Sequence, residues 1–453
     1  MQQARLIPVS GIGSEKEAEQ RATSALLAVL TVVRDLSTEL FAPLGASRAQ
    51  KATVEAWTEV QFGHNGRKIR PDGLLRISYG KAIWNALFEI KTGEATLEAE
   101  QINAYWDVAR GEKFDHVVTI SNEIAPNADA HPTGGLRVRS NSPVQVTHLS
   151  WTAILTTAVR LKQHKGVDDP EQAFLLGELI RYLEHPASGA MAFSDMGPNW
   201  VAVRDGARAH ALSRKDEGVA DVVARWEQLI RYAALKLGSE IGEDVVHVLS
   251  KAHHDAKVRQ TDLVEQLCGP GTLDGALRIP HTAGDLEVLA DLRAQQLVAS
   301  ITVAAPQDKG AVGRVSWLVN QLKDVNPSLL LEAYPRNAKA GKSATLGQVL
   351  EDRHVLVGDD KREAFKFRVA WRRDMGMSRK SGGKNPGFID TVLDLIDVFY
   401  GEVVQNIAPW IPPAPKIKRP AQLSPESDEL EPEAETAGID PPTAWRPTSA
   451  GES

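Results

Sequence analysis

The apolar and polar positions between residues 70 and 105 predict the element around which the N-terminal part of the chain is organised. A strand begins at Asp72, turns near Gly80, and returns as a second, apolar strand that ends with Glu89-Ile90-Lys91. Because side chains alternate along a strand, Glu89 and Lys91 share one face and Ile90 points to the other. A turn near Gly80 places Asp72 level with position 88 or 89 of the returning strand. The pattern therefore predicts a hairpin whose end carries two carboxylates and an ammonium group.

Helical and strand-like patterns lie on both sides of this hairpin. Apolar residues at helical spacing predict a first helix over residues 14–41, with Ser14 as its N-cap and Glu17 completing a capping box. Glu15 and Glu19 continue the buried stripe toward the start of this helix, so either acid can point into a site there. Acids in a first turn also simply favour the helix dipole. The other elements follow in the order strand 54–62, the hairpin, helix 95–110, strand 114–121 and strand 144–149.

The rest of the chain divides by pattern into three further parts. Residues 151–212 carry two amphipathic helical patterns and are predicted to be a helical extension. Residues 213–408 alternate helical with strand-like runs and predict a second mixed α/β domain, through which a protein partner could bind. Residues 409–453 are rich in proline and then in acidic residues, with few apolar side chains, so we expect them to be disordered. The predicted fold class is α/β, with a first domain over residues 1–150.

Composition narrows the class of protein. The 453-residue chain has a net charge of −7, of which residues 416–453, with eight acidic and four basic residues, contribute −4. The remainder is close to neutral, which excludes a generally basic, histone-like protein. The single cysteine, Cys268, excludes an internal disulfide framework and a cysteine-rich zinc site. No apolar run reaches the length of a membrane span and the N-terminus lacks a secretory pattern, so we expect a cytoplasmic protein.

The end of the predicted hairpin has the residue types of a metal site. Two opposed carboxylates, Asp72 and Glu89, destabilise a sheet unless a cation lies between them. A hard divalent cation that prefers oxygen ligands, Mg²⁺ or Mn²⁺, fits this pair. The alternatives are structural: Asp72-Gly73 is also an ordinary turn sequence, and Glu89 with Lys91 could be an exposed charge pattern. The apolar residues around Glu89 favour a buried strand instead, in which a charge needs a partner.

These residues resemble the signature of the PD-(D/E)XK nuclease superfamily. The signature reads Pro71-Asp72 followed by Glu89-Ile90-Lys91, and Gln101 with Tyr105 matches the QxxxY element of the RecB-like branch. The alternative for the QxxxY match is that both residues, one helical turn apart, lie on the surface. The resemblance covers residues 14–150 and implies a restriction-endonuclease-like αβββαβ core.

The resemblance also implies a metal-dependent nuclease. Asp72, Glu89 and the carbonyl of Ile90 are the implied ligands of Mg²⁺ or Mn²⁺, together with an acid of the first helix, Glu19 or Glu15. The ion would polarise the scissile phosphate and lower the pKa of a bound water.

Catalysis is assigned by the same resemblance. Lys91 would orient the attacking water or neutralise the charge that develops on the phosphorane. Gln101 and Tyr105 would position the substrate strand or the lysine. We expect a nuclease with DNA favoured over RNA as substrate, and a role in bacterial antiviral defence or stress response. The alternative is a catalytically inactive protein of the same fold that binds nucleic acid or acts as a scaffold.

The second domain offers a candidate nucleic-acid contact. A basic stretch over residues 361–384 contains Arg379, Lys380 and Lys384 around a glycine-rich loop, which suits phosphate binding. A solvated strand edge studded with basic residues is an equally good explanation. No pattern in the sequence indicates an oligomeric state.

Two further motifs in this domain are interpreted as non-functional. Residues 340–343 (AGKS) resemble the end of a phosphate-binding loop, but Arg336 occupies the position that requires the first glycine. The pair His253-His254 is predicted to lie on the surface, because adjacent helical residues point about 100° apart and do not share one ion.

Overall fold

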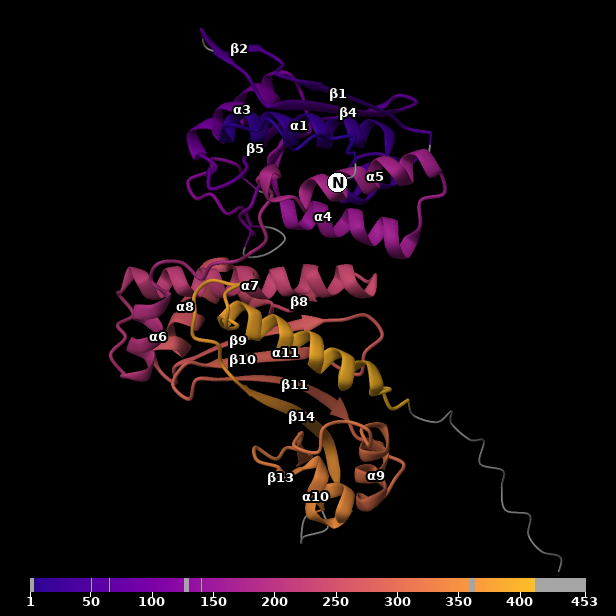
Figure 1. Ribbon diagram of the computed structural model, residues 1–453, viewed down its shortest axis with the longest axis vertical. Helices are drawn as coiled ribbons and strands as arrows, with labels where there is room; N and C mark the ends of the chain where they lie inside the picture. Colours follow the sequence, from indigo (N-terminus) through magenta and orange to yellow (C-terminus); the bar gives the residue numbers. More distant parts are fainter. Residues whose placement is uncertain are drawn as a thin grey trace, which may run out of the picture. The chain divides into compact units, whose positions relative to one another are not determined.

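The computed structural model describes residues 4–49, 51–64, 66–125, 130–139, 141–357 and 363–411, and is a mixed α/β structure, as predicted (Figure 1). Its strands form a five-stranded and a seven-stranded sheet, besides one small hairpin. The predicted disordered tail lies outside the described residues from position 412 onward. Within the described ranges, no helix is both long and apolar enough to cross a membrane.

The five-stranded sheet carries the predicted hairpin. Its strands have the order β1-β4-β5-β6-β7, antiparallel from β1 to β5 and parallel from β5 to β7. A short separate hairpin, β2 (Phe62–His64) and β3 (Arg67–Ile69), lies between β1 and β4 in the chain, where the sequence pattern predicted that the first strand continues to residue 62. The other elements here are α1 (Glu15–Val32), α2 (Arg34–Phe41), β1 (Thr53–Thr58), β4 (Gly73–Tyr79), β5 (Ala82–Ile90), α3 (Ala99–Gly111), β6 (His116–Ser121) and β7 (Gln145–Ser150).

The register of the hairpin is the predicted one. Gly80, in the turn, has a φ of +60°, a left-handed conformation that glycine adopts readily. Gly73 of β4 pairs with Phe88 of β5, so Asp72, one residue before β4, is level with Glu89. The N–H of Asp72 donates to the carbonyl of Phe88 at 3.0 Å, which extends the ladder to this position.

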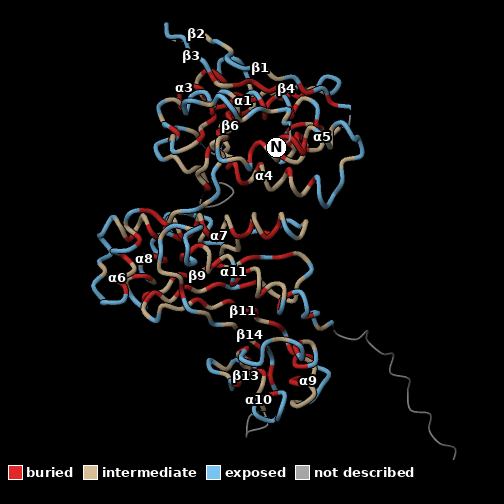
Figure 2. Tube along the Cα trace, in the orientation of Figure 1, coloured by how far each residue is buried: buried red, intermediate tan, exposed pale blue. Residues whose placement is uncertain are grey.

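Buried apolar residues lie on both faces of the sheet, and they fix which face each side chain of β4 and β5 joins. Figure 2 shows the buried residues concentrated in the sheet and its covering helices. Phe88 and Ile90 belong to the core that packs with α1 and α2. Leu74 and Leu87 belong to a second cluster on the opposite face, which contains residues of α3. Because side chains alternate, the face of Leu74 and Leu87 also carries Asp72 and Glu89, and Ile90 points away from it as predicted.

The predicted continuous helix over residues 14–41 is wrong at one position. Val33 has an extended backbone (φ −83°, ψ 92°) and separates α1 from α2. Residues 31–33 are three consecutive β-branched residues, whose restricted side-chain rotamers weaken a helix. The cap also differs from the predicted box. Ser14 accepts from the N–H of Glu17, but the Glu17 carboxylate accepts from Gly13 rather than from Ser14.

The seven-stranded sheet forms the second α/β part. Its strands have the order β13-β12-β14-β11-β10-β9-β8, and all neighbours are antiparallel. The strands are β8 (Val246–His247), β9 (Thr272–Arg278), β10 (Leu286–Asp291), β11 (Gln296–Ala304), β12 (Leu330–Pro335), β13 (Lys342–Thr345) and β14 (Ala364–Asp374). The helices after β7 are α4 (Trp151–Arg160), α5 (Pro170–Leu183), α6 (Trp200–Arg208), α7 (Glu217–Ile241), α8 (Ala256–Cys268), α9 (Ala311–Gln321), α10 (Leu346–Glu351) and α11 (Phe388–Glu402).

The helices predicted as one extension, residues 151–212, divide between two hydrophobic cores. Buried residues of α4 and α5 belong to the core of the first sheet, and those of α6 to the core of the second. Lys342 and Ser343, the end of the motif that resembles a phosphate-binding loop, lie in β13 and pair with β12. A paired strand at this position is consistent with rejecting the motif as a phosphate-binding loop.

Candidate active site

The structure brings Asp72, Glu89 and Lys91 together at the end of the central hairpin. Glu89 is the penultimate residue of β5, and the ammonium of Lys91 lies 2.6 Å from its Oε1. The Oδ2 of Asp72 accepts a hydrogen bond of 2.8 Å from the N–H of Ile90. This contact was not predicted. It fixes the carboxylate of Asp72 against the strand that carries Glu89.

Glu89 is the most constrained group of the three. It has no accessible surface, and the ammonium of Lys91 is the positive charge that contacts it in the described part of the chain. Burial, reinforced by the charge of Asp72 and opposed by Lys91, raises the pKa of the Glu89 carboxyl to about 7. A buried carboxylate with unused lone pairs is a poor structural element but a suitable cation ligand.

Asp72 shares this environment. Burial raises the pKa of its carboxyl above the ordinary range, although the hydrogen bond from Ile90 and the charge of Lys91 act in the opposite direction. The pKa of both adjacent carboxyls is therefore raised. Such a pair is stabilised by any added positive charge, whether a proton or a metal ion.

The question left open between Glu15 and Glu19 has a geometric answer. The Oε2 of Glu19 lies 3.5 Å from the ammonium of Lys91, so Glu19 is the acid of α1 that reaches the site. Lys91 thus contacts two carboxylates. Burial alone would lower the pKa of Lys91, but the attraction of Glu89, Glu19 and Asp72 raises it, which keeps the side chain protonated.

Gln101 and Tyr105 brace the segment before Asp72. The amide of Gln101 donates to the hydroxyl of Tyr105 at 2.9 Å, and this hydroxyl donates to the carbonyl of Arg70 at 3.1 Å. Tyr105 is buried, so the interpretation as a surface residue is wrong for it. Burial and the nearby charge of Glu89 raise the pKa of Tyr105, so the hydroxyl stays a donor.

A cavity of about 460 Å³ opens at this site. Glu19, Pro71 and Asp72, which the sequence singled out, line it together with residues that it did not: Lys16, Gln20, Thr23, Ser24, Thr58, Glu59 and Arg70. The position of Arg70, next to the Pro71-Asp72 motif, is the one sequence signal that could have found this group.

The donor set fits a divalent cation only in part. Asp72 and Glu89 supply carboxylate oxygens, and a carboxylate that contacts one ammonium still has lone pairs for a second cation. In the described part of the chain, no three histidine, cysteine, aspartate or glutamate side chains are grouped closely enough to hold a metal ion. Glu19 binds Lys91 instead. A cation here would complete its shell with water or substrate oxygens, as Mg²⁺ commonly does.

The predicted nucleic-acid contacts lie in a loop that is tied to another segment. Arg379 approaches Asp195 at 3.6 Å, and its carbonyl accepts from the N–H of Met196. Lys380 forms an isolated bridge with Asp195, while Lys384 is exposed. Phosphate binding by these three residues stays a prediction.

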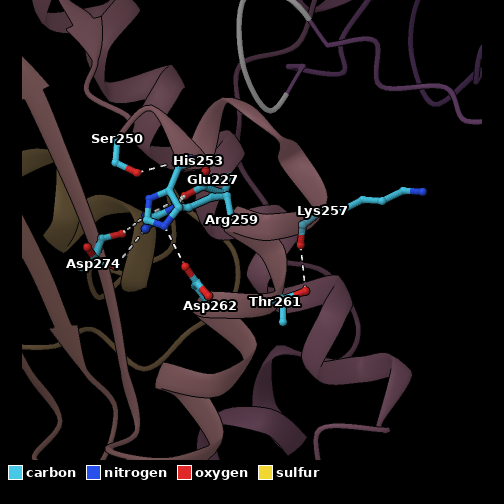
Figure 3. Close-up of polar contacts among 8 residues, drawn as sticks. All are labelled: Glu227, Ser250, His253, Lys257, Arg259, Thr261, Asp262 and Asp274. Atoms are coloured by element: carbon cyan, nitrogen blue, oxygen red, sulfur yellow. Dashed lines mark hydrogen bonds and ion pairs between the residues drawn. The ribbon is translucent and has the colours of Figure 1, made fainter.

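Of the two histidines predicted to lie on the surface, His254 is exposed and His253 is half-buried beside a buried ion pair (Figure 3). The Nε2 of His253 lies 2.8 Å from Asp262, beside an ion pair between Glu227 of α7 and Arg259 of α8. Arg259 donates twice to Glu227 (3.1 and 3.2 Å), and it also donates to the carboxylate and the carbonyl of Asp274 in β9 (3.2 and 2.6 Å). Arg259 therefore joins two helices and a strand, which is a structural task.

Comparison with known proteins leaves the resemblance untested: no family model, curated protein or solved structure matches this chain.

The raised pKa of Glu89 predicts a specific pH dependence of stability. The folded state holds the proton up to about pH 7, whereas the carboxyl normally releases it near 4.5, so the folded protein binds more protons in this window and its stability falls as pH rises. For wild type in EDTA, we expect a loss of up to roughly 3 kcal/mol from this group. Urea unfolding of wild type and Glu89→Gln between pH 5 and 8 measures it; equal pH dependence of the two would contradict the assignment.

The cluster around Arg259 predicts a stability effect without a catalytic one. Arg259→Met leaves Glu227 buried without its counter-ion, which costs about 3–5 kcal/mol. The double variant Glu227→Leu/Arg259→Met should recover most of that loss, because no unpaired charge remains. The test compares the denaturant midpoints of wild type, the single variant and the double variant. A single variant as stable as wild type would contradict this prediction, because it would show that Glu227 becomes neutral without Arg259.

Proposed function

We propose that this protein is a divalent-metal-dependent nuclease that hydrolyses phosphodiester bonds of nucleic acid, with DNA the favoured substrate. The observation that carries the proposal is the fully buried Glu89, level with Asp72 and bound by Lys91, next to a cavity. The resemblance of Pro71-Asp72 and Glu89-Ile90-Lys91 to the PD-(D/E)XK signature supports the same reaction.

Each residue has a defined task in this proposal. Asp72 and Glu89, with the carbonyl of Ile90, would hold Mg²⁺ or Mn²⁺, which supplies positive charge at the scissile phosphate and lowers the pKa of water. The hydrogen bond from the N–H of Ile90 keeps Asp72 oriented before substrate arrives. Lys91, held between Glu89 and Glu19, would donate to a phosphate oxygen as negative charge develops on it.

The bracing pair supports this geometry indirectly. Tyr105 donates to the backbone carbonyl of Arg70, two residues before Asp72, and Gln101 donates to the hydroxyl of Tyr105. They would hold the segment that carries the first carboxylate, so they act as positioning residues. The seven-stranded part would then select the substrate or bind a partner protein, in a bacterial defence or stress response.

Non-enzymatic nucleic-acid binding is the alternative function. A protein of this kind would bind DNA or RNA but leave it intact, with or without metal. The retained set of two acids and a lysine favours the enzyme, because a binding protein gains nothing from two carboxylates held close together with one of them fully buried.

The decisive assay tests chemistry and metal together. Labelled single- and double-stranded DNA and RNA are incubated with the protein in Mg²⁺, Mn²⁺ or EDTA. We expect cleavage with either metal, none in EDTA, and a drop of about 100-fold or more in Lys91→Ala, the loss typical of a group that acts in the transition state.

Lys236 provides a matched control for this assay. Its ammonium also contacts two carboxylates, Glu240 and Asp397, both at 2.7 Å, but in the second part of the chain. Lys236→Ala should therefore cleave as wild type does. Cleavage that persists in EDTA, or an equal loss in both lysine variants, contradicts the proposed site. Binding without cleavage under all conditions supports the alternative.

A further inference from the structure

Glu59, the residue that follows β1, has an unusual backbone conformation beside the candidate site. Its φ is +59°, in the left-handed region that costs a residue with a side chain about 1 kcal/mol or more. Its N–H donates to the carbonyl of Asp72 at 3.2 Å. The contact with Asp72 thus helps to hold the backbone of Glu59 in this conformation.

The carboxylate of Glu59 is occupied by groups from two other elements. Its Oε2 pairs with the guanidinium of Arg70, and its Oε1 accepts from the amide of Gln20 at 3.3 Å. All three residues line the cavity next to Asp72. The side chains of Arg70 and Glu59 are 57% and 50% exposed, and ion pairs of this exposure contribute only about 0–1 kcal/mol to stability.

The backbone of Arg70 is held in place, whereas its guanidinium can change binding partner. Tyr105 donates to its carbonyl, so the main chain is braced. In the described part of the chain, Glu59 is the residue that binds its guanidinium. A guanidinium binds phosphate oxygens with two parallel hydrogen bonds, and a phosphate next to Asp72 lies within reach of a residue two positions away.

Charge on the cavity wall determines what a phosphate ligand has to overcome. Lys16 and Arg70 line the cavity together with Glu19, Glu59 and Asp72, so the acids outnumber the bases before any ligand enters. A polyanionic strand is repelled by this excess of acids unless a bound metal ion offsets it. Breaking the Arg70–Glu59 pair leaves the net charge of the wall unchanged, but it frees the guanidinium to donate to a phosphate, and the cost is small because the pair is exposed.

We propose that Glu59 and Arg70 form an exchangeable gate: Arg70 leaves Glu59 to bind the phosphate that adjoins the scissile one, and Glu59 competes for it when no strand is present. This inference rests on the proposed nuclease function. It adds a phosphodiester subsite at Arg70. It also explains the strained Glu59, whose carboxylate would weaken the binding of anions that contact Arg70 alone.

Binding measurements in the Lys91→Ala background test the gate, because the probe then stays intact. Affinity for a labelled DNA oligonucleotide is titrated against salt in the presence of Mg²⁺ for four forms: the parent, Glu59→Gln, Arg70→Gln and the Glu59→Gln/Arg70→Gln double variant. Arg70→Gln should weaken binding about tenfold and lower the log–log salt slope by roughly 0.7–0.9, as expected for one lost phosphate contact. Glu59→Gln should tighten binding several-fold.

The double variant isolates the exchange. If Glu59 acts by holding Arg70, then Glu59→Gln should raise DNA affinity in the parent but hardly at all in Arg70→Gln. The reason is that Arg70→Gln has no ion pair left to break. Arg137→Gln is the matched control. Arg137 pairs with Asp107 at 2.7 Å and is also 57% exposed, but it does not line the cavity, so its salt slope should equal that of the parent.

Three results would overturn the gate. They are an unchanged affinity for Glu59→Gln, an equal gain with and without Arg70, and a slope change in Arg70→Gln no larger than that of Arg137→Gln. If the DNA affinity is the same with and without Glu59 and Arg70, the gate is contradicted but the proposed nuclease function is not. A protein that binds no nucleic acid in any form contradicts both.

Discussion

A carboxylate without accessible surface must be protonated or contact a positive charge, and the site in the first sheet is built around such a carboxylate, Glu89. The hairpin places Glu89 at the end of β5, level with a second acid, Asp72. Lys91 is the cation that the fold itself places against Glu89. This one ammonium is shared between Glu89 and Glu19, and the charge of Asp72 acts on it as well. The site is therefore electrostatically incomplete in the protein alone, and an added cation would complete it.

The surrounding elements act mainly to hold that incomplete site in place. The core under Phe88 and Ile90 fixes β5 on one face, and the cluster with Tyr105 fixes the other. Tyr105 also anchors the carbonyl of Arg70, so the chain enters Asp72 along a defined path. Glu59, which follows β1 and has a left-handed backbone conformation, holds the same segment by donating its N–H to the carbonyl of Asp72. A left-handed backbone at Glu59 and an excess of acids over bases thus lie together beside one cavity, and both features are common at functional sites.

Local sequence rules predicted what depends on neighbouring residues. The turn at Gly80 and the alternation of side chains were enough to place Asp72 level with position 88 or 89, and the structure selects Glu89. They could not predict contacts between distant segments. The pairing of Arg70 with Glu59 depends on β1 lying beside β4, and the choice of Glu19 over Glu15 depends on how α1 packs. The break at Val33 was missed because apolar periodicity continues across it, although the backbone does not.

The position of a bound metal is the most direct test of this account. Crystals grown with Mn²⁺ would be measured for anomalous scattering, which identifies the ion independently of any assay. The account predicts a peak in contact with carboxylate oxygens of both Asp72 and Glu89, at the roughly 2.0–2.6 Å typical of hard divalent cations. A saturated crystal with no peak at these two residues, or with Lys91 still the only cation against Glu89, would contradict it.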